Sequence, residues 1–353
     1  MNPWPGQALA EGELGAALLH IERGHLTLAH CALTEAVADG VSAGTTACLF
    51  YGAPAVEFVL RCAGQSDRRI EGAVDAVVVR RLAAATGRRA RGDRPALAEF
   101  DLIRGLTGLG AVLLSRGTST PLLGEVLAYL VELAEPVHIG DVTLPGWWTD
   151  TGPGSEELAG GHANNGMAHG AAGVLALLAI AQRHGAEVSG QKKAIGSLTR
   201  WLERYGNTYW LTWDQLTGSE PRPVEPARPS WCYGAVGSAR ARQLAALALG
   251  DSDRRQAAEN TAHAALTDPR ASHLTVDACL CHGWAGLLTT IRAVAADSPD
   301  PDRFTGHITA LAGRLSAALG SMPKPGFLEG RAGVELALLG TRNTGWTRAL
   351  LID

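Results

Sequence analysis

Apolar residues gather along the chain in seven short runs that are rich in Ala and Leu. The runs are Ala16–Ile21, Val56–Leu60, Leu109–Leu114, Val174–Ala181, Leu244–Leu249, Leu287–Ala295 and Val334–Leu339. Each run follows a Gly-x-x-Gly motif, in which Ala55 replaces the second Gly of the second copy. The first glycines of the motifs are Gly12, Gly52, Gly105, Gly170, Gly234, Gly283 and Gly330. We interpret the runs as inner helices whose first turns carry the glycines. Gly costs about 1 kcal/mol relative to Ala inside a helix, so its recurrence suggests close backbone approach between neighbouring helices.

Between the apolar runs lie charged segments with the 3.6-residue pattern of helices that have one solvated face. They are Ala76–Ala85, Pro121–Glu135, Gln191–Tyr205, Asp253–Thr267 and Asp302–Leu319. No period-two strand pattern is evident. The first glycines lie 40 to 65 residues apart (52 − 12 = 40; 170 − 105 = 65), near the period of helical-pair repeats. The pattern predicts an all-α fold, a closed α/α toroid (a double-layered α/α barrel) of about seven helical pairs, as one domain over residues 1–353.

In such a toroid, the N-termini of the inner helices converge at one mouth of the ring. The long connections Val142–Gly166 and Thr212–Ser230, rich in Pro, Gly and Trp, are expected to lie over that mouth. The first inner helix begins near residue 12, and no preceding segment is long enough to be its outer partner. We therefore predict a less covered seam that exposes apolar residues of Ala16–Ile21.

Composition narrows the class of protein. The 353 residues are 46% hydrophobic and 19% charged, which suits a sizeable core, and a net charge of −4 without a basic run argues against nucleic acid as the main partner. The longest apolar stretch, Val174–Ala181, is far shorter than the roughly 20 residues that span a bilayer. The N-terminus lacks the charged and apolar regions of a signal peptide. Six cysteines are too few for a disulfide scaffold, so we expect a cytoplasmic protein with metal-binding or catalytic cysteines.

Reactive side chains recur at short offsets before the first Gly of several motifs. They are Cys232 and Cys281 (two residues before), His169 and His282 (one before), Asp101 (four before) and Arg228 (six before). If the repeats are related by symmetry, equal offsets bring these groups together around one axial cavity. A buried thiol beside a chance histidine is the simpler interpretation of Cys281-His282 alone. The shared offsets favour a functional site.

Cys232, Cys281 and His282 make a Cys₂His set. Two soft thiolates and an imidazole favour zinc over magnesium or calcium. Three protein ligands leave the fourth position open, as in catalytic zinc sites. The alternative is a closed structural site with Cys279 as the fourth ligand, which steric reach within the short loop disfavours.

We interpret His169 as a general acid/base, because its offset matches that of His282. Asp101 could orient the His169 imidazole, and Arg228 could bind a carbonyl or carboxylate of the substrate. Tyr233 is a further candidate proton donor. The simpler alternatives are a helix cap or core role for His169, a helix N-cap for Asp101 and a solvated loop charge for Arg228.

The motifs closely resemble the lanthionine synthetase C-like family, the cyclases of lanthipeptide biosynthesis. The matching segments are Phe100–Gly108, Pro145–Trp148, Ala168–Gly173, Arg228–Gly234, Cys281–Gly286 and Trp346–Leu351. The resemblance implies an α/α toroid whose zinc ion is held by Cys232, Cys281 and His282, with His169, Asp101 and Arg228 as active-site groups. The short N-terminus and Ala55 depart from the family pattern.

The resemblance implies a zinc-dependent lanthionine synthetase, which adds a peptide Cys thiol across dehydroalanine or dehydrobutyrine to close a thioether ring. Its substrate is a dehydrated precursor peptide, with a separate dehydratase and a transporter as further candidate partners. No dehydratase segment fits in the chain, so we expect a free-standing cyclase. Two rival functions remain: a zinc-thiolate transferase that joins glutathione to dehydroamino acids, and a non-catalytic module that binds modified peptides.

Overall fold

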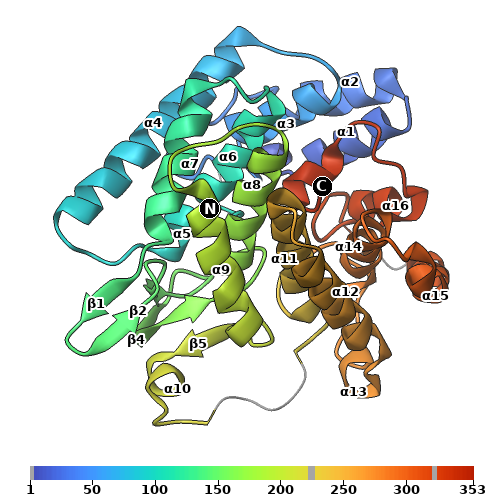
Figure 1. The fold of residues 1–353 in the computed structure, drawn as a ribbon. Helices are drawn as coiled ribbons and strands as arrows, with labels where there is room; N and C mark the ends of the chain where they lie inside the picture. The colour runs from blue at the N-terminus through green and yellow to red at the C-terminus, as the bar shows by residue number, and fades with distance from the viewer. Residues whose placement is uncertain (1–3, 222–226, 320–323) are drawn as a thin grey trace.

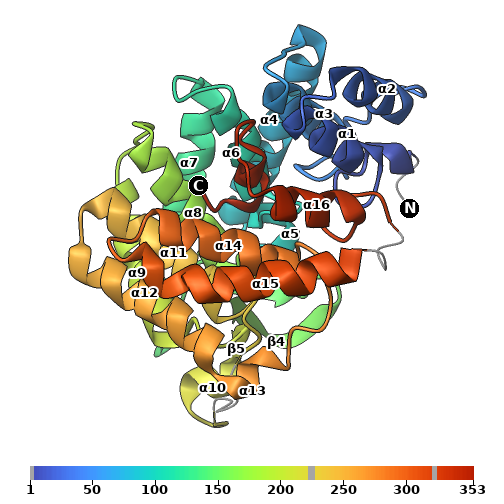
Figure 2. The same ribbon diagram turned by 90° about the vertical axis from the view of Figure 1, so that its right-hand side faces the viewer.

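Two concentric layers of helices make up the described part of this computed structural model, residues 4–221, 227–319 and 324–353 (Figures 1 and 2). Within these residues the inner layer consists of α1 (Glu13–Glu22), α3 (Ala53–Cys62), α6 (Leu106–Ser115), α8 (Ala171–Arg183), α11 (Ala235–Leu249), α14 (Trp284–Ala296) and α16 (Arg331–Leu339). Each inner helix contacts the next, and α16 contacts α1. The contact between α1 and α16 closes the ring. The predicted α/α toroid is therefore confirmed.

The outer layer packs against the inner one pair by pair. Its helices are α2 (Leu26–Ala36), α4 (Arg68–Ala90), α7 (Pro121–Leu133), α9 (Gln191–Tyr205), α12 (Ser252–Thr267) and α15 (Thr305–Ala318). Each contacts the inner helix that precedes it in the chain. The burial follows the sequence pattern: residues 171–181 of α8 are all buried, whereas α9 buries Ala194, Leu198 and Leu202 and exposes Lys192. An inner helix is enclosed on all sides, and an outer helix only on one.

The first Gly of all seven motifs is the N-cap residue of its inner helix. The second Gly lies against a backbone carbonyl six residues earlier; the pairs are Leu102–Gly108, Met167–Gly173, Trp231–Gly237, Leu280–Gly286 and Phe327–Gly333. A Cβ at these glycines would collide with that carbonyl oxygen. In these five repeats the glycines thus let each loop fold back over the first turn of its own helix. The prediction that they bring neighbouring helices together is wrong for these five motifs.

Five short strands contradict the prediction that the chain forms none. A hairpin pairs β1 (Val137–Ile139) with β2 (Val142–Leu144), and a three-stranded sheet has the order β3 (Thr149–Thr151), β4 (Glu157–Asn164), β5 (Trp210–Thr212), all antiparallel. Four strands are three residues long, and β4 is exposed in its first half and buried in its last four residues. The three-residue strands are therefore too short to show a regular alternation of apolar and polar residues in the sequence, and β4 shows none. Residues 222–226 of the predicted Thr212–Ser230 connection lie outside the described residues.

The described chain also contains short helical turns. They are η1 (Pro5–Gln7), α5 (Leu97–Phe100), α10 (Trp213–Thr217), α13 (Pro269–Ser272), η2 (Pro301–Phe304) and η4 (Trp346–Leu350). The α5 turn ends directly before Asp101, and α10 follows β5. These turns lie in the connections, and the inner and outer layers are built without them.

The prediction of an uncovered first helix is wrong. The outer partner of α1 is α2, which follows it in sequence rather than preceding it. Leu14, Ala17 and Leu18 of α1 are fully buried. The sequence reasoning missed α2 because its apolar residues do not all face inward: Leu26 and Leu28 are 66% and 51% exposed. The seam between α1 and α16 is covered.

The C-terminal segment, residues 340–353, folds into the ring, and the chain end marked C lies among the inner helices (Figure 1). Trp346, Leu350 and Ile352 are fully buried. The indole Nε1 of Trp231 donates to the carbonyl of Leu350 at 2.8 Å. This segment ties the closing end of the chain to the loop that carries Cys232.

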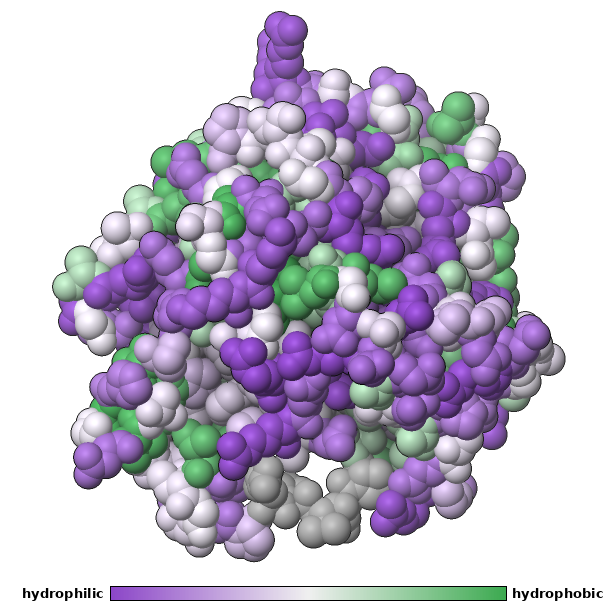
Figure 3. All heavy atoms as spheres, in the orientation of Figure 1, coloured by the Kyte–Doolittle hydropathy of each residue, from purple (hydrophilic) through white to green (hydrophobic). Residues whose placement is uncertain are grey.

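The face in Figure 3 is largely hydrophilic, with green patches that include one over the β1–β2 hairpin at its lower left. Val137 and Ile139 of β1 are 49% and 42% exposed. A bilayer needs roughly 20 apolar residues in one helix. Among the described residues, no helix combines the length and hydropathy needed for a membrane span.

Candidate functional site

Backbone hydrogen bonds join the loops that precede the inner helices. The N–H of Ala168 donates to Cys232 (3.3 Å), that of Cys232 to Cys281 (3.1 Å), that of Cys281 to Leu328 (3.1 Å) and that of Leu328 to Ala10 (2.9 Å). All five residues stand two positions before the first Gly of their repeats. Because each loop bonds to the next around the ring, equal offsets in sequence become neighbours in space.

Cys232, Cys281 and His282 lie together at this end of the ring. Their potential ligand atoms, two sulfurs and one ring nitrogen, are all within 4.8 Å of one another. Cys232 is 4% exposed, while Cys281 and His282 are half-buried. Two thiols and an imidazole at this spacing are the donor set that zinc prefers, so the residues present fit a zinc ion.

A hydrogen bond between the two thiols shifts their pKa values in opposite directions. A hydrogen bond from Cys281 lowers the pKa of Cys232 to about 7, against the opposing effect of burial. The same bond, together with burial, raises the pKa of Cys281 well above its ordinary value. Cys232 therefore becomes a thiolate near neutral pH, which prepares the pair for a cation.

His282 has a carboxylate partner that the sequence analysis did not identify. Its Nε2 lies 3.1 Å from an Asp277 oxygen. Hydrogen bonds with Asp277 and the Cys279 sulfur raise the pKa of His282 to about 10. Although burial opposes it, hydrogen bonding to His282 and Cys279 lowers the pKa of Asp277 to about 2. Because Asp277 engages Nε2 of His282, Nδ1 is the ring nitrogen that remains available to other partners.

Cys279 lies beside His282 but outside the Cys232–Cys281–His282 group. Its sulfur accepts a hydrogen bond from the His282 backbone N–H at 3.4 Å. It forms a second group of potential ligands with Asp277 and His282, again within 4.8 Å, but it is not grouped with Cys232 and Cys281. His282 is the residue that the two groups share.

His169 and Asp101 lie in the loops before α8 and α6. The Nδ1 atom of His169 is 2.7 Å from one Asp101 carboxylate oxygen. The other oxygen accepts from the backbone N–H groups of Arg104 (2.6 Å) and Gly105 (2.8 Å) at the start of α6. Asp101 therefore both holds the turn just before α6 and engages His169. Because Nδ1 is occupied, Nε2 is the ring nitrogen available for a reacting group.

Tyr233 packs directly against His169, with ring centroids 6.1 Å apart and an interplanar angle of 27°. Its hydroxyl accepts from the Asn164 side-chain amide at 2.9 Å. Burial raises the pKa of Tyr233 above its ordinary value, so the phenol stays protonated. The half-exposed Trp210 of β5 contacts the same ring edge-on at 6.3 Å.

Arg228 lies near the cysteine pair. Its positive charge contributes to the lowered pKa of Cys232. Its backbone N–H donates to the Tyr209 hydroxyl at 3.0 Å. The buried Nε atom has no hydrogen-bond partner among the described residues. Arg228 is thus placed close to the thiols with an unused donor.

Asn164 and Asp277 are residues that the sequence reasoning missed, although a signal for both was present. Asn164 stands six residues before Gly170, and Asp277 stands six before Gly283. Arg228 has the same offset from its own Gly. An offset search extended to all polar residues finds these two as well.

The family of the chain follows from comparison with known proteins. The model of the family described as "Lanthionine synthetase C-like protein" matches residues 3–351. The chain belongs to this family. A solved structure titled "Nisin cyclase" covers 99% of this chain and 93% of its own, with a TM-score of 0.81 at 20% identity. At that identity the likeness establishes the α/α toroid fold.

A named relative of the chain is the nisin biosynthesis protein NisC of Lactococcus lactis subsp. lactis. It is 28% identical over 214 residues, which make up 56% of this chain. The match covers 50% of the relative, so it spans about half of that protein's length. The site residues are therefore assigned here from their own geometry.

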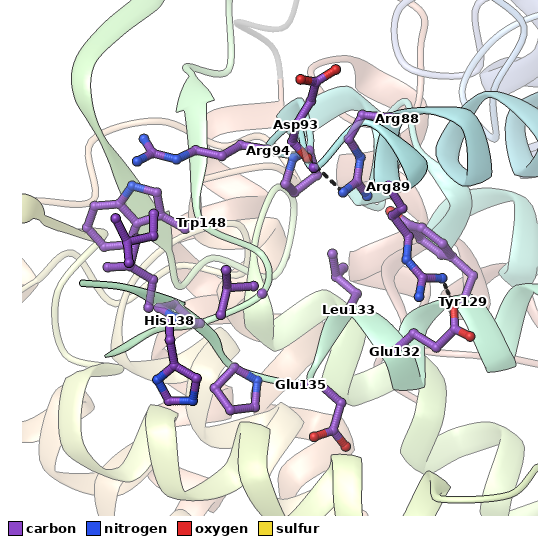
Figure 4. A pocket seen from close by; sticks show the side chains of 18 residues that line it. Arg88, Arg89, Asp93, Arg94, Tyr129, Glu132, Leu133, Glu135, His138 and Trp148 are labelled. Atoms are coloured by element: carbon purple, nitrogen blue, oxygen red, sulfur yellow. Dashed lines mark hydrogen bonds and ion pairs between the residues drawn. The ribbon is translucent and has the colours of Figure 1, made fainter. Parts of the chain in front are cut away.

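A separate pocket of about 470 Å³ lies between α4, α7 and the β1–β2 hairpin (Figure 4). None of the sequence-predicted site residues lines it. Its arginines already have carboxylate partners; the pairs are Arg88–Glu99, Arg89–Glu132 and Arg94–Asp150. The pocket and the cysteine cluster are thus distinct features of the molecule.

Proposed function

We propose that the chain is a lanthipeptide cyclase that adds a peptide Cys thiol to dehydroalanine or dehydrobutyrine, forming lanthionine or methyllanthionine. The observation that carries this proposal is the juxtaposition of two elements at one end of the ring. The loop of Cys232, which holds the potential metal ligands, bonds directly to the loop of His169, which carries a carboxylate–imidazole pair.

Cys232, Cys281 and His282 would hold the zinc ion, and Asp277 would orient the His282 ring through Nε2. When bound, zinc supplies a fourth, open position that favours the thiolate form of an incoming peptide thiol. A free Cys thiol has a pKa of about 8.5, so little of it is thiolate at neutral pH without such help.

The addition is an isomerisation in which every atom is retained. The S–H bond of the substrate breaks and releases its proton, and the sulfur forms a bond to the β-carbon as the C=C π bond breaks. The resulting enolate takes up one proton at the α-carbon, which balances the proton that the thiol released. His169 delivers that proton from Nε2, while Asp101 holds Nδ1 and stabilises the charged ring. Arg228 binds the substrate carbonyl whose oxygen becomes negative. Tyr233 is the alternative proton donor beside His169.

The substrate we propose is a dehydrated precursor peptide. The name of the relative NisC places that protein in the biosynthesis of nisin. A separate dehydratase that supplies the dehydroamino acids, and a transporter that exports the product, are the corresponding candidate partners. Observation of their genes beside the gene for this chain, together with a Ser/Thr/Cys-rich precursor gene, would support this assignment.

The test uses a synthetic peptide that carries a dehydroalanine and a downstream Cys. Zinc-loaded protein should convert it to a product of unchanged mass that no longer reacts with a thiol reagent. Cys281→Ala serves as the inactive control. A parallel reaction contains glutathione and a peptide that has dehydroalanine but no Cys. If the protein adds glutathione to the Cys-free peptide but closes no ring in the first peptide, the cyclase proposal is contradicted. If it binds the peptides and catalyses neither reaction, a catalytic function is contradicted.

A further inference from the structure

A second cavity, of about 510 Å³, opens at the end of the ring opposite the cysteine cluster. It lies at the C-terminal ends of inner helices, since Arg183 is the last residue of α8 and Asp297 is the C-cap of α14. The C-terminal segment, residues 340–353, contributes Arg342 and Arg348. The cavity therefore joins three separate parts of the chain.

Positive charge is in excess in this cavity. Its lining contains four arginines, Arg183, Arg240, Arg342 and Arg348, against two aspartates, Asp297 and Asp353. The balance of these side-chain charges is 4 − 2 = +2. Burial, followed by the nearby Arg348 and Arg183, lowers the pKa of His184 in the same lining, which favours the neutral ring and adds no charge to this balance.

The arginines differ in how far the protein satisfies them. Arg240 is 1% exposed and engages the carbonyl of Ile352 and the Asp297 carboxylate at 2.8 and 2.7 Å. Arg183 reaches Asp297 only at 3.6 Å, and Arg342 reaches Asp353 only at 3.5 Å.

The side chain of Arg348 forms no hydrogen bond or ion pair with the described residues. Three guanidinium groups thus keep N–H donors directed to this region.

A purely structural role explains only one of these three arginines. Cations stabilise the negative ends of helices, which accounts for Arg183 at the end of α8. Arg342 and Arg348 belong to the C-terminal segment and are not needed for that purpose. Their presence around one cavity with a surplus of two positive charges requires a different explanation.

We propose that this cavity binds an anion of the phosphate class, either free or as the phosphate group of a larger molecule. Guanidinium groups present paired N–H donors that match phosphate oxygens, and they do so better than ammonium groups. The volume falls within the range of small-molecule sites, about 300–1,000 Å³, and exceeds the needs of one phosphate. This site lies outside the proposed thioether chemistry.

The experiment is calorimetric titration of the full chain with inorganic pyrophosphate, at an ionic strength matched with chloride. The wild type should bind pyrophosphate with a Kd of about 1 mM or tighter. Arg348→Gln and Arg183→Gln should each weaken binding at least ~10-fold, the loss expected for a charge-assisted contact. Arg68→Gln, an exposed arginine at the start of α4, is the matched control and should bind like the wild type.

Two further arms identify the source of the phosphate group. Inorganic phosphate alone tests the free ion, and AMP tests a phosphate carried by a larger molecule. Because Arg348 has no hydrogen-bond or ion-pair partner in the described part of the chain, its Gln variant should fold normally, which circular dichroism checks. Undetectable pyrophosphate binding to the wild type overturns the proposal. So does binding that Arg348→Gln and Arg183→Gln leave undiminished.

Discussion

Two imidazole–carboxylate pairs stand at the same end of the ring, and they differ in ways that matter chemically. His169 bonds to Asp101 through Nδ1 at 2.7 Å, and His282 bonds to Asp277 through Nε2 at 3.1 Å. The Asp101 side chain is fully buried, whereas that of Asp277 is 36% exposed. Both histidines stand one residue before the first Gly of a repeat.

The difference shows how one offset can support two roles. His169 has its outer nitrogen, Nε2, left for a reacting group, which suits proton transfer. In His282 the carboxylate engages Nε2, so Nδ1, the ring nitrogen nearer the backbone, remains available. Two thiols lie within 4.8 Å of the potential ligand atom of His282, which suits metal binding. The repeat positions the ring, and the carboxylate selects which nitrogen remains. Four substitutions test this comparison.

The largest expected effect is that of Cys281→Ala. Removing one of three ligands should reduce zinc from about one per chain to nearly none and abolish thioether formation, because a two-ligand site holds the ion weakly. Elemental analysis measures the zinc, and Cys279→Ala is the matched control that should retain it. Zinc loss in the control would instead favour a closed site with four protein ligands.

His169→Asn should leave the zinc content unchanged and lower turnover by ~10²–10⁴, the usual effect of losing a general acid–base. The measurements are zinc content and the rate of thioether formation on the dehydroalanine peptide. Loss of zinc would make His169 a ligand and contradict its assignment here. A wild-type rate would move the proton donor to water or Tyr233.

Asp277→Asn should weaken zinc binding by ~10–100-fold, the usual effect of removing the carboxylate partner of a ligating His. Excess zinc should restore the rate, because the three ligands themselves remain. Competition with a chelator measures the affinity. An unchanged affinity would mean that the Asp277–His282 contact does not orient the ligand.

Asp101→Asn should have the smallest effect, about a tenfold loss of turnover, comparable to one pKa unit of lost interaction. The Asn oxygen can still accept from the N–H groups of Arg104 and Gly105 before α6, so the free energy of unfolding should change little. The rate and a denaturant titration are measured together. A large loss of stability would assign Asp101 mainly to holding the turn before α6, and an undiminished rate would exclude it from orienting His169.

Much of the fold was predictable because the inner helices carry strong local signals. A Gly N-cap followed by an apolar run marks every one of them. The outer helix α2 was missed because it exposes Leu26 and Leu28, and the strands were missed because they are short. Asp277 and Asn164 were missed because the offset of six residues was noted only for Arg228 and not compared across the other repeats.

The sequence by itself determined the repeats, the positions of the inner helices and the offsets of Cys232, Cys281, His169 and His282. These are local properties, set by glycine, helix capping and apolar runs. The tertiary structure decided which loops meet, which nitrogen of each histidine is engaged and how the ring closes. The closure depends on contacts between α1 and α16, some 300 residues apart. No local pattern encodes such contacts, because they arise only when the whole ring packs.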